Sequence, residues 1–132
     1  MEKRTIEVPA IYEPAGQYNH AIVVSGGRTA YLSGVVGRRK DGSVPDGIVA
    51  QTELAFDNLT EVMRACGGSL DDIVKVNVYV GEEFARLGAE IREVRSRYLK
   101  PDFPVSTLLQ VSGYAGPQYL IEIEAIAVLP ED

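Results

Sequence analysis

The sequence predicts an α+β domain in which two helices cover one face of a mixed, six-stranded sheet. Short apolar or alternating segments bounded by Gly and Pro indicate strands, and two longer stretches carry apolar residues at helical spacing. Their order is β-β-β-α-β-α-β-β, a pattern in which the helices collect on one side of the sheet. With no repeat or linker to divide the chain, we expect a single domain over residues 1–132.

The first half of the chain is expected to hold three strands and a helix. Residues 4–9 alternate weakly and indicate a short strand, and a loop with Pro14 and Gly16 follows. Residues 21–24 and 29–33 are strands joined by Gly26-Gly27, which predicts a hairpin. Residues 48–66 carry apolar side chains on one face of a 3.6-residue period, and Gly67-Gly68 ends this helix.

The second half is expected to hold three strands and a helix. Residues 73–80 alternate between valine and polar side chains, as in a half-buried strand. Residues 82–98 form the second amphipathic helix, and Pro101 and Pro104 separate it from a strand over residues 105–111. A glycine-rich turn over 113–117 leads into the last strand, residues 119–129.

The amino-acid composition argues against several classes of function. The chain is 45% apolar and 24% charged, with a net charge of −6, which argues against nucleic-acid binding because that needs a clustered basic face. The single cysteine, Cys66, cannot form an intrachain disulfide and is expected to act as a small buried hydrophobe. No apolar stretch has the length of a signal-peptide core or a membrane span, so we expect no membrane partner and a cytoplasmic location.

Two carboxylates in the last strand, Glu122 and Glu124, stand in a segment that otherwise has the pattern of a buried strand. Alternation places both on one face, opposite Ile121 and Ile123. A buried carboxylate needs a partner, a hydrogen bond or a proton. A functional role is one explanation for such a carboxylate, and we expect it for Glu122 rather than Glu124. The alternative is that one of the glutamates pairs with a lysine or arginine at an interface between subunits.

The sheet face away from the helices is expected to expose apolar and tyrosine side chains. Such a patch is large for a monomer. We therefore expect the chain to form homo-oligomers that bury this face.

Five separated motifs occur along the chain in an order that resembles one family. They are Gly16-Gln17-Tyr18-Asn19-His20-Ala21, Tyr31-Leu32-Ser33-Gly34, Gln51-Thr52 with Asn58-Leu59, the segment 70–76, and Phe103-Pro104 with the strand 121–127. Together they resemble the YjgF/RidA family of enamine/imine deaminases, also called ribonuclease L-PSP.

That resemblance implies a chorismate-mutase-like fold, a barrel-like homotrimer with clefts between subunits, and hydrolysis of reactive enamines or imines without metal or cofactor. In usual members an arginine in the cleft binds the substrate carboxylate. A glutamate at the Glu122 position orients water or assists proton transfer, and a tyrosine at the Tyr18 position closes over the ligand.

The sequence departs from the family pattern where the substrate is held. Ser106 replaces the arginine, which should weaken carboxylate binding there by about 1.5–3 kcal/mol. Arg92 stands roughly where the family often has asparagine, and Gln17 replaces a proline. Arg92 or Arg95 could enter the cleft and restore the cation, although Glu90 and Glu93 between the basic residues favour a solvated helix face.

The candidate site residues follow from these motifs. The expected catalytic residues are Glu122 and Tyr18, and the expected substrate-binding residues are Ser33, Gly34, Ser106, Thr107, Arg92 and His20. Tyr18 could also be an aromatic plug, His20 a structural residue, and Ser106 a packed strand residue.

A small-molecule hydrolase or deaminase acting on an imine, enamine or related intermediate is the preferred function. Its specificity is expected to be altered by Ser106. The alternative is a trimeric ligand-binding protein without turnover. Ribonuclease activity is disfavoured by the acidic charge.

Overall fold

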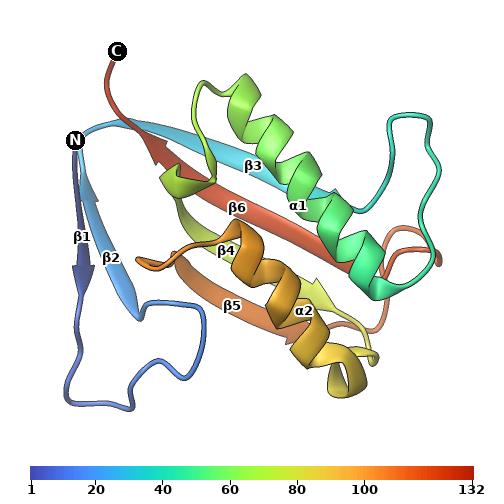
Figure 1. The fold of residues 1–132 in the computed structure, drawn as a ribbon. Helices are drawn as coiled ribbons and strands as arrows, with labels where there is room; N and C mark the ends of the chain where they lie inside the picture. Colours follow the sequence, from blue (N-terminus) through green and yellow to red (C-terminus); the bar gives the residue numbers. More distant parts are fainter.

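The computed structural model describes residues 1–132 and contains six strands and two helices in the predicted order. The elements are β1 (Glu2–Ile6), β2 (Ala21–Ser25), β3 (Arg28–Val36), α1 (Ile48–Ala65), a 3₁₀ turn (Leu70–Asp72), β4 (Ile73–Val80), α2 (Phe84–Tyr98), β5 (Val105–Gln110) and β6 (Ile121–Leu129). Both helices lie on one face of the sheet (Figure 1). The predicted α+β class is therefore confirmed.

The six strands are hydrogen-bonded as a four-stranded sheet and a two-stranded ribbon. The sheet has the order β3-β6-β4-β5, in which only β4 and β5 are parallel. The antiparallel ribbon β1–β2 stands at one side of the sheet (Figure 1). A single parallel bridge between Asn19 and Val105 joins the end of the ribbon's loop to β5.

The predicted hairpin between β2 and β3 is wrong, although the turn itself exists. Gly26 and Gly27 have φ angles of 73° and 83°, which favour glycine. A Cβ at Gly27 would stand 2.6 Å from the Val128 side chain and 2.8 Å from the Leu129 carbonyl oxygen. The two glycines let the chain cross close to the end of β6, after which β2 pairs with β1 and the outer edge of β3 stays unpaired.

The core lies between the helices and the sheet. It is formed by the apolar stripes of α1 and α2 and by alternate residues of β4 and β6 that face them, among them Phe56, Leu59, Met63, Ile91, Val94, Val76, Val78, Ile121 and Ile123. The alternation predicted for β6 is confirmed, since Ile121 and Ile123 are fully buried. The expectation that the two glutamates are buried is wrong, because they point to the face that no helix covers and are only half-buried.

Two polar residues of α1 hold loops against the helix. Gln51 is 2% exposed; its amide nitrogen donates to the carbonyls of Pro45 (3.1 Å) and Gln118 (2.9 Å), and its oxygen accepts from the Leu120 amide (2.8 Å). Asn58 donates to the carbonyl of Val36 at 2.9 Å. These side chains satisfy backbone groups of irregular segments, which would otherwise lack partners.

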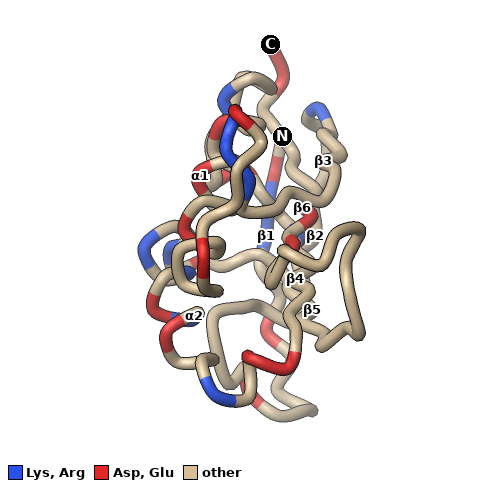
Figure 2. The backbone as a smooth tube through the Cα atoms, turned by 90° about the vertical axis from the view of Figure 1, so that its right-hand side faces the viewer, with Lys and Arg blue, Asp and Glu red and all other residues tan.

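The surface carries charges of both signs on the helices. Figure 2 shows basic and acidic residues interspersed along α1 and α2. Cys66, at the end of α1, is a free and half-buried thiol. Neither helix is both long and apolar enough to span a bilayer.

Candidate functional site

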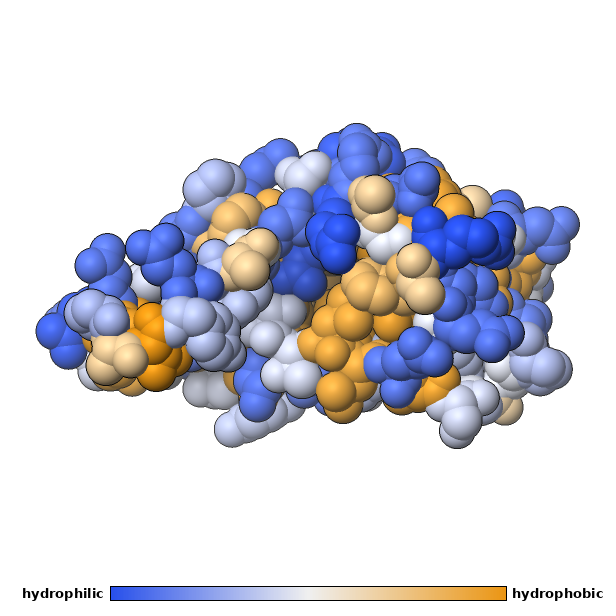
Figure 3. All heavy atoms as spheres, turned by 90° about the horizontal axis from the view of Figure 1, so that it is seen from below, coloured by the Kyte–Doolittle hydropathy of each residue, from blue (hydrophilic) through white to orange (hydrophobic).

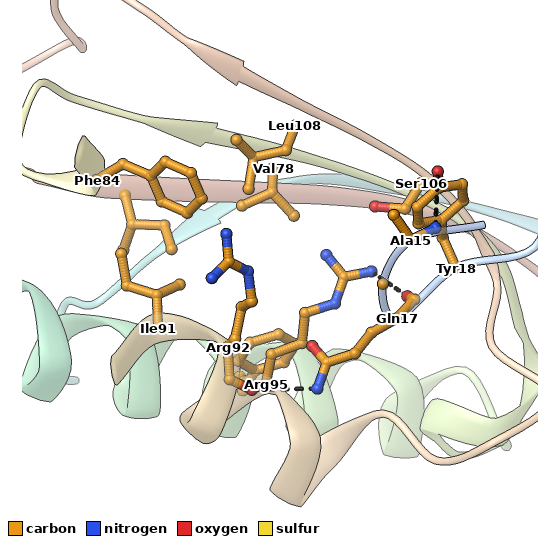
Figure 4. Close-up of a pocket in the computed structure, with 13 residues that line it drawn as sticks. Ala15, Gln17, Tyr18, Val78, Phe84, Ile91, Arg92, Arg95, Ser106 and Leu108 are labelled. Atoms are coloured by element: carbon orange, nitrogen blue, oxygen red, sulfur yellow. Dashed lines mark hydrogen bonds between the residues drawn. The ribbon is translucent and has the colours of Figure 1, made fainter. Parts of the chain in front are cut away.

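A cavity of about 270 Å³ opens on the helix side of the sheet, between α2, the start of β5 and the loop that precedes β2. Its walls are mostly apolar, with Val78, Phe84, Ile91, Leu108 and Ile121 among them. Its polar lining comes from Gln17, Tyr18, Arg92, Arg95 and Ser106. In Figure 4 the two arginine side chains rise from α2 into this space, toward Val78 and Leu108.

Arg95 is a buried cation in this cavity. The residue is 8% exposed, and one terminal nitrogen, Nη2, donates to the Gln17 carbonyl at 2.8 Å. Its Nε is buried and has no partner. Burial lowers the pKa of Arg95 to about 10, so the guanidinium stays charged at neutral pH.

Arg92 lies one helical turn before Arg95 and lines the same cavity. Its guanidinium carbon is 5.6 Å from the centre of the Phe84 ring, a cation–π contact. Two acids near α2, Glu53 and Glu93, form ion pairs with Arg97 instead, each at 3.4 Å. Neither cavity arginine forms an ion pair, which leaves two positive charges without a counter-charge.

The loop before β2 closes one side of the cavity and is attached directly to α2. The Gln17 amide nitrogen donates to the Arg92 carbonyl at 3.2 Å, while the Gln17 carbonyl accepts from Arg95. The Gln17 side-chain oxygen is buried without a partner. Tyr18 follows in the lining, and its hydroxyl accepts from the Ala15 amide at 3.4 Å.

Ser106 faces the same cavity as the two arginines. It stands opposite Val76 in the parallel pair β4–β5, on the face covered by the helices. Figure 4 shows it close to Tyr18, at the opposite wall from α2. Thus Ser106 on β5 and the two arginines on α2 line the same cavity from opposite walls.

Glu122 does not belong to this cavity. It follows Ile121, which lines the cavity, so its side chain points to the other face of the sheet. There it lies against Gly34, where an added Cβ would stand 2.6 Å from one carboxylate oxygen and 2.9 Å from the carboxylate carbon. The absence of a side chain at Gly34 therefore leaves room for the Glu122 carboxylate.

The neighbouring Glu124 is held by two donors on the same face. Asn77 Nδ2 donates to one of its oxygens at 3.0 Å, and the Tyr79 hydroxyl donates to the same oxygen. These hydrogen bonds, Tyr79 first, lower the pKa of Glu124, and the bond to Glu124 raises the pKa of Tyr79. Both donors go to Glu124, which leaves the Glu122 carboxylate free for another partner.

The remaining candidate residues lie apart from the arginine cavity. Ser33 and Gly34 form a bulge in β3 opposite Glu124. Thr107 pairs with Asn77 and shares its face. His20 contacts Tyr12 and Tyr18 edge-on, with ring centres 5.1 and 5.9 Å apart, beside a separate depression in the ribbon's loop.

The structure thus brings Tyr18, Arg92 and Ser106 together and places Glu122 on the opposite face of the sheet. Sequence reasoning did not identify Gln17 as a lining residue with an unpaired polar atom. The spacing of Arg92 and Arg95 predicts that they share one site, because residues three apart lie on the same side of a helix. No group of three or more His, Cys, Asp or Glu side chains is arranged to hold a metal ion.

Comparison with known proteins gives consistent results. The family described as Endoribonuclease L-PSP matches residues 9–129. The chain is 33% identical to the RutC family protein UK114 of Drosophila melanogaster, over 96% of this chain and 89% of that protein. It is also 33% identical to the 2-iminobutanoate/2-iminopropanoate deaminase of Dermatophagoides farinae, over 96% and 97% of the two chains.

Solved structures agree with these relatives. The Rid family protein YyfB of Yersinia pestis, whose function is unknown, has a TM-score of 0.86 and 32% identity, over 98% of this chain and 100% of that one. RidA of the Antarctic bacterium Psychrobacter sp. has a TM-score of 0.72 and 31% identity, over 96% and 99%. With a family match over most of its length and relatives above 30% identity, the chain belongs to the YjgF/Rid family.

Proposed function

We propose that this protein hydrolyses small imines or enamines to carbonyl compounds and ammonia, with a specificity altered by Ser106. The observation that carries the proposal is the free Glu122 carboxylate, which Gly34 accommodates by having no side chain. Relatives with about 30% identity are named 2-iminobutanoate/2-iminopropanoate deaminases, which supports this class of reaction.

The chemistry requires few groups. Water adds to the carbon of a protonated C=N bond, and the resulting carbinolamine loses ammonia as its hydroxyl becomes a carbonyl. A carboxylate that holds the water accepts its proton during the attack and returns a proton to the leaving nitrogen. Glu122 is the group proposed for this role, and holding the water in place supplies much of the rate.

A complete site of this kind needs two copies of the chain. Ser106, Tyr18 and the arginines open on the helix side, whereas Glu122 points away from them on the other side. We therefore propose that the cavity of one copy faces the Glu122 region of the next, in a homotrimer with clefts between subunits. The uncovered sheet face, on which Tyr31 is 80% exposed, and the unpaired edge of β3 are the surfaces available for assembly.

The test is to generate 2-iminobutanoate in situ with a threonine dehydratase and follow 2-oxobutanoate release in the presence of the protein. Glu122→Gln removes the proton acceptor while preserving the shape, and is expected to lower kcat/KM by about 10²–10⁴-fold. Glu124→Gln is the comparison, because that acid is already occupied by Asn77 and Tyr79. If Glu122→Gln retains full turnover, Glu122 is not the acid–base group.

A ligand-binding protein without turnover is the second candidate, and one observation favours it. Within a single chain the cavity holds cations and hydroxyls but no carboxylate. If the release of 2-oxobutanoate equals the buffer rate while ligands still bind, this second candidate is the correct one.

A further inference from the structure

The two cavity arginines present a positive charge that nothing in the chain neutralises. Arg95 is more than nine-tenths buried, and its Nε is a buried donor without an acceptor. A buried cation without a counter-charge is unfavourable, because it has lost water and gained no anionic partner. An anion that enters the cavity supplies that partner.

We propose that Arg92 and Arg95 together bind the carboxylate of a small α-imino acid, in place of the arginine that Ser106 replaces. The inference rests on the proposed function for the imine, and assigns the carboxylate to a pair of residues on α2. Both side chains point from the helix into the cavity, toward the wall that contains Ser106 (Figure 4). A guanidinium offers a planar set of donors that matches the two oxygens of a carboxylate.

The rest of the lining restricts the ligand further. The volume of about 270 Å³ is just below the roughly 300–1,000 Å³ of sites for drug-sized molecules, which selects a small metabolite. Phe84, Ile91 and Leu108 offer an apolar surface to a short aliphatic side chain. Leu108 keeps 37% of its surface exposed. Figure 3 shows an apolar area near the centre of the face that it presents.

Gln17 adds a hydrogen-bond acceptor to a cavity in which the arginines supply donors. Its side-chain oxygen is a buried acceptor without a donor, in the same lining as the two cations. An α-imino acid carries an N–H group next to its carboxylate, so it satisfies both kinds of unpaired atom at once. An ionised dicarboxylate satisfies the cations but has no donor for the oxygen of Gln17.

The test is a calorimetric titration with 2-oxobutanoate, a stable carboxylate with the carbon skeleton of the proposed imine. Arg92→Gln and Arg95→Lys are each expected to weaken Kd by about 10- to 100-fold, the scale of losing a charged hydrogen bond. Arg97→Gln is the matched control on the same helix, because Arg97 is paired with Glu53 and Glu93 outside the cavity. Its Kd is expected to equal that of the wild type.

Further titrations separate this inference from the reaction. Binding and turnover are measured separately on the wild type. Arginine-dependent binding without turnover refutes the proposed deaminase reaction but supports the carboxylate site. Binding that survives in both arginine variants, or no binding by the wild type, overturns the inference even if turnover is found. So does tighter binding of inorganic phosphate or of the neutral 2-oxobutanamide. Because Arg95 also fixes the loop, Arg92→Gln at the more exposed position decides the outcome if Arg95→Lys does not fold.

Discussion

Replacing Gly34 by alanine should displace the Glu122 carboxylate without dismantling the fold. The new methyl carbon would stand 2.6 Å from a carboxylate oxygen, so that oxygen has to retreat by roughly 0.8 Å to reach ordinary van der Waals separation. A displacement near 1 Å at a reacting centre costs up to about 100-fold in rate. We therefore expect Gly34→Ala to lower kcat/KM by about 10- to 100-fold.

The stability cost of the same change should be small. The contact is with the end of a half-exposed side chain, so we expect a loss at the lower end of overpacking effects, about 1 kcal/mol in the free energy of unfolding. Urea unfolding measures this loss, and 2-oxobutanoate release measures the rate.

A double-mutant cycle tests whether the methyl group acts through Glu122. In the Glu122→Ala background the clashing atoms are gone, so Gly34→Ala should have little further effect on either stability or rate. If the alanine lowers both by the same amount whether or not Glu122 is present, the reasoning is refuted. The effect would then come from the β3 bulge itself.

Three further changes test other parts of the structure. Gln51→Leu removes three hydrogen bonds to backbone groups and should cost about 3 kcal/mol of unfolding free energy, seen as a Tm lower by about 10 °C. Hydrogen bonds from the N-terminal amine and the Gly27 amide lower the pKa of Glu131 to about 2, so the stability that wild type has over Glu131→Gln should be present above pH 4.5 and vanish as the pH falls through 2. Tyr79→Phe removes the first cause of the lowered pKa of Glu124, so an NMR titration should find that pKa raised; an unchanged midpoint would contradict the hydrogen bond.

Much of the fold could be predicted from periodicity because burial depends on it directly. The spacing of apolar residues identified both helices, and the alternation in β6 correctly placed Glu122 and Glu124 opposite Ile121 and Ile123. Periodicity does not predict which strands are hydrogen-bonded to each other. Gly26-Gly27 specified a turn, but the pairing of β2 with β1 depends on contacts between distant segments.

The site was predictable to a smaller extent for a similar reason. The motifs drew attention to Tyr18, Ser106 and Arg92, which the structure brings to one cavity. The burial of Arg95 depends on the loop carrying Gln17, 78 residues earlier in the chain, and no local pattern reports such a contact. That Ser106 faces the helices, on the side opposite Glu122, depends on the register of β5 against β4.

The separation of the β1–β2 ribbon from the main sheet has a consequence for how this family can diversify. The ribbon's loop supplies Gln17 and Tyr18 to the cavity, yet the core is built from the two helices and the four-stranded sheet. Substitutions in the loop can therefore reshape the wall that selects a ligand without disturbing the packing on which folding depends. This part of the ligand-contacting wall can therefore change independently of the core, unlike the part that α2 and the sheet supply.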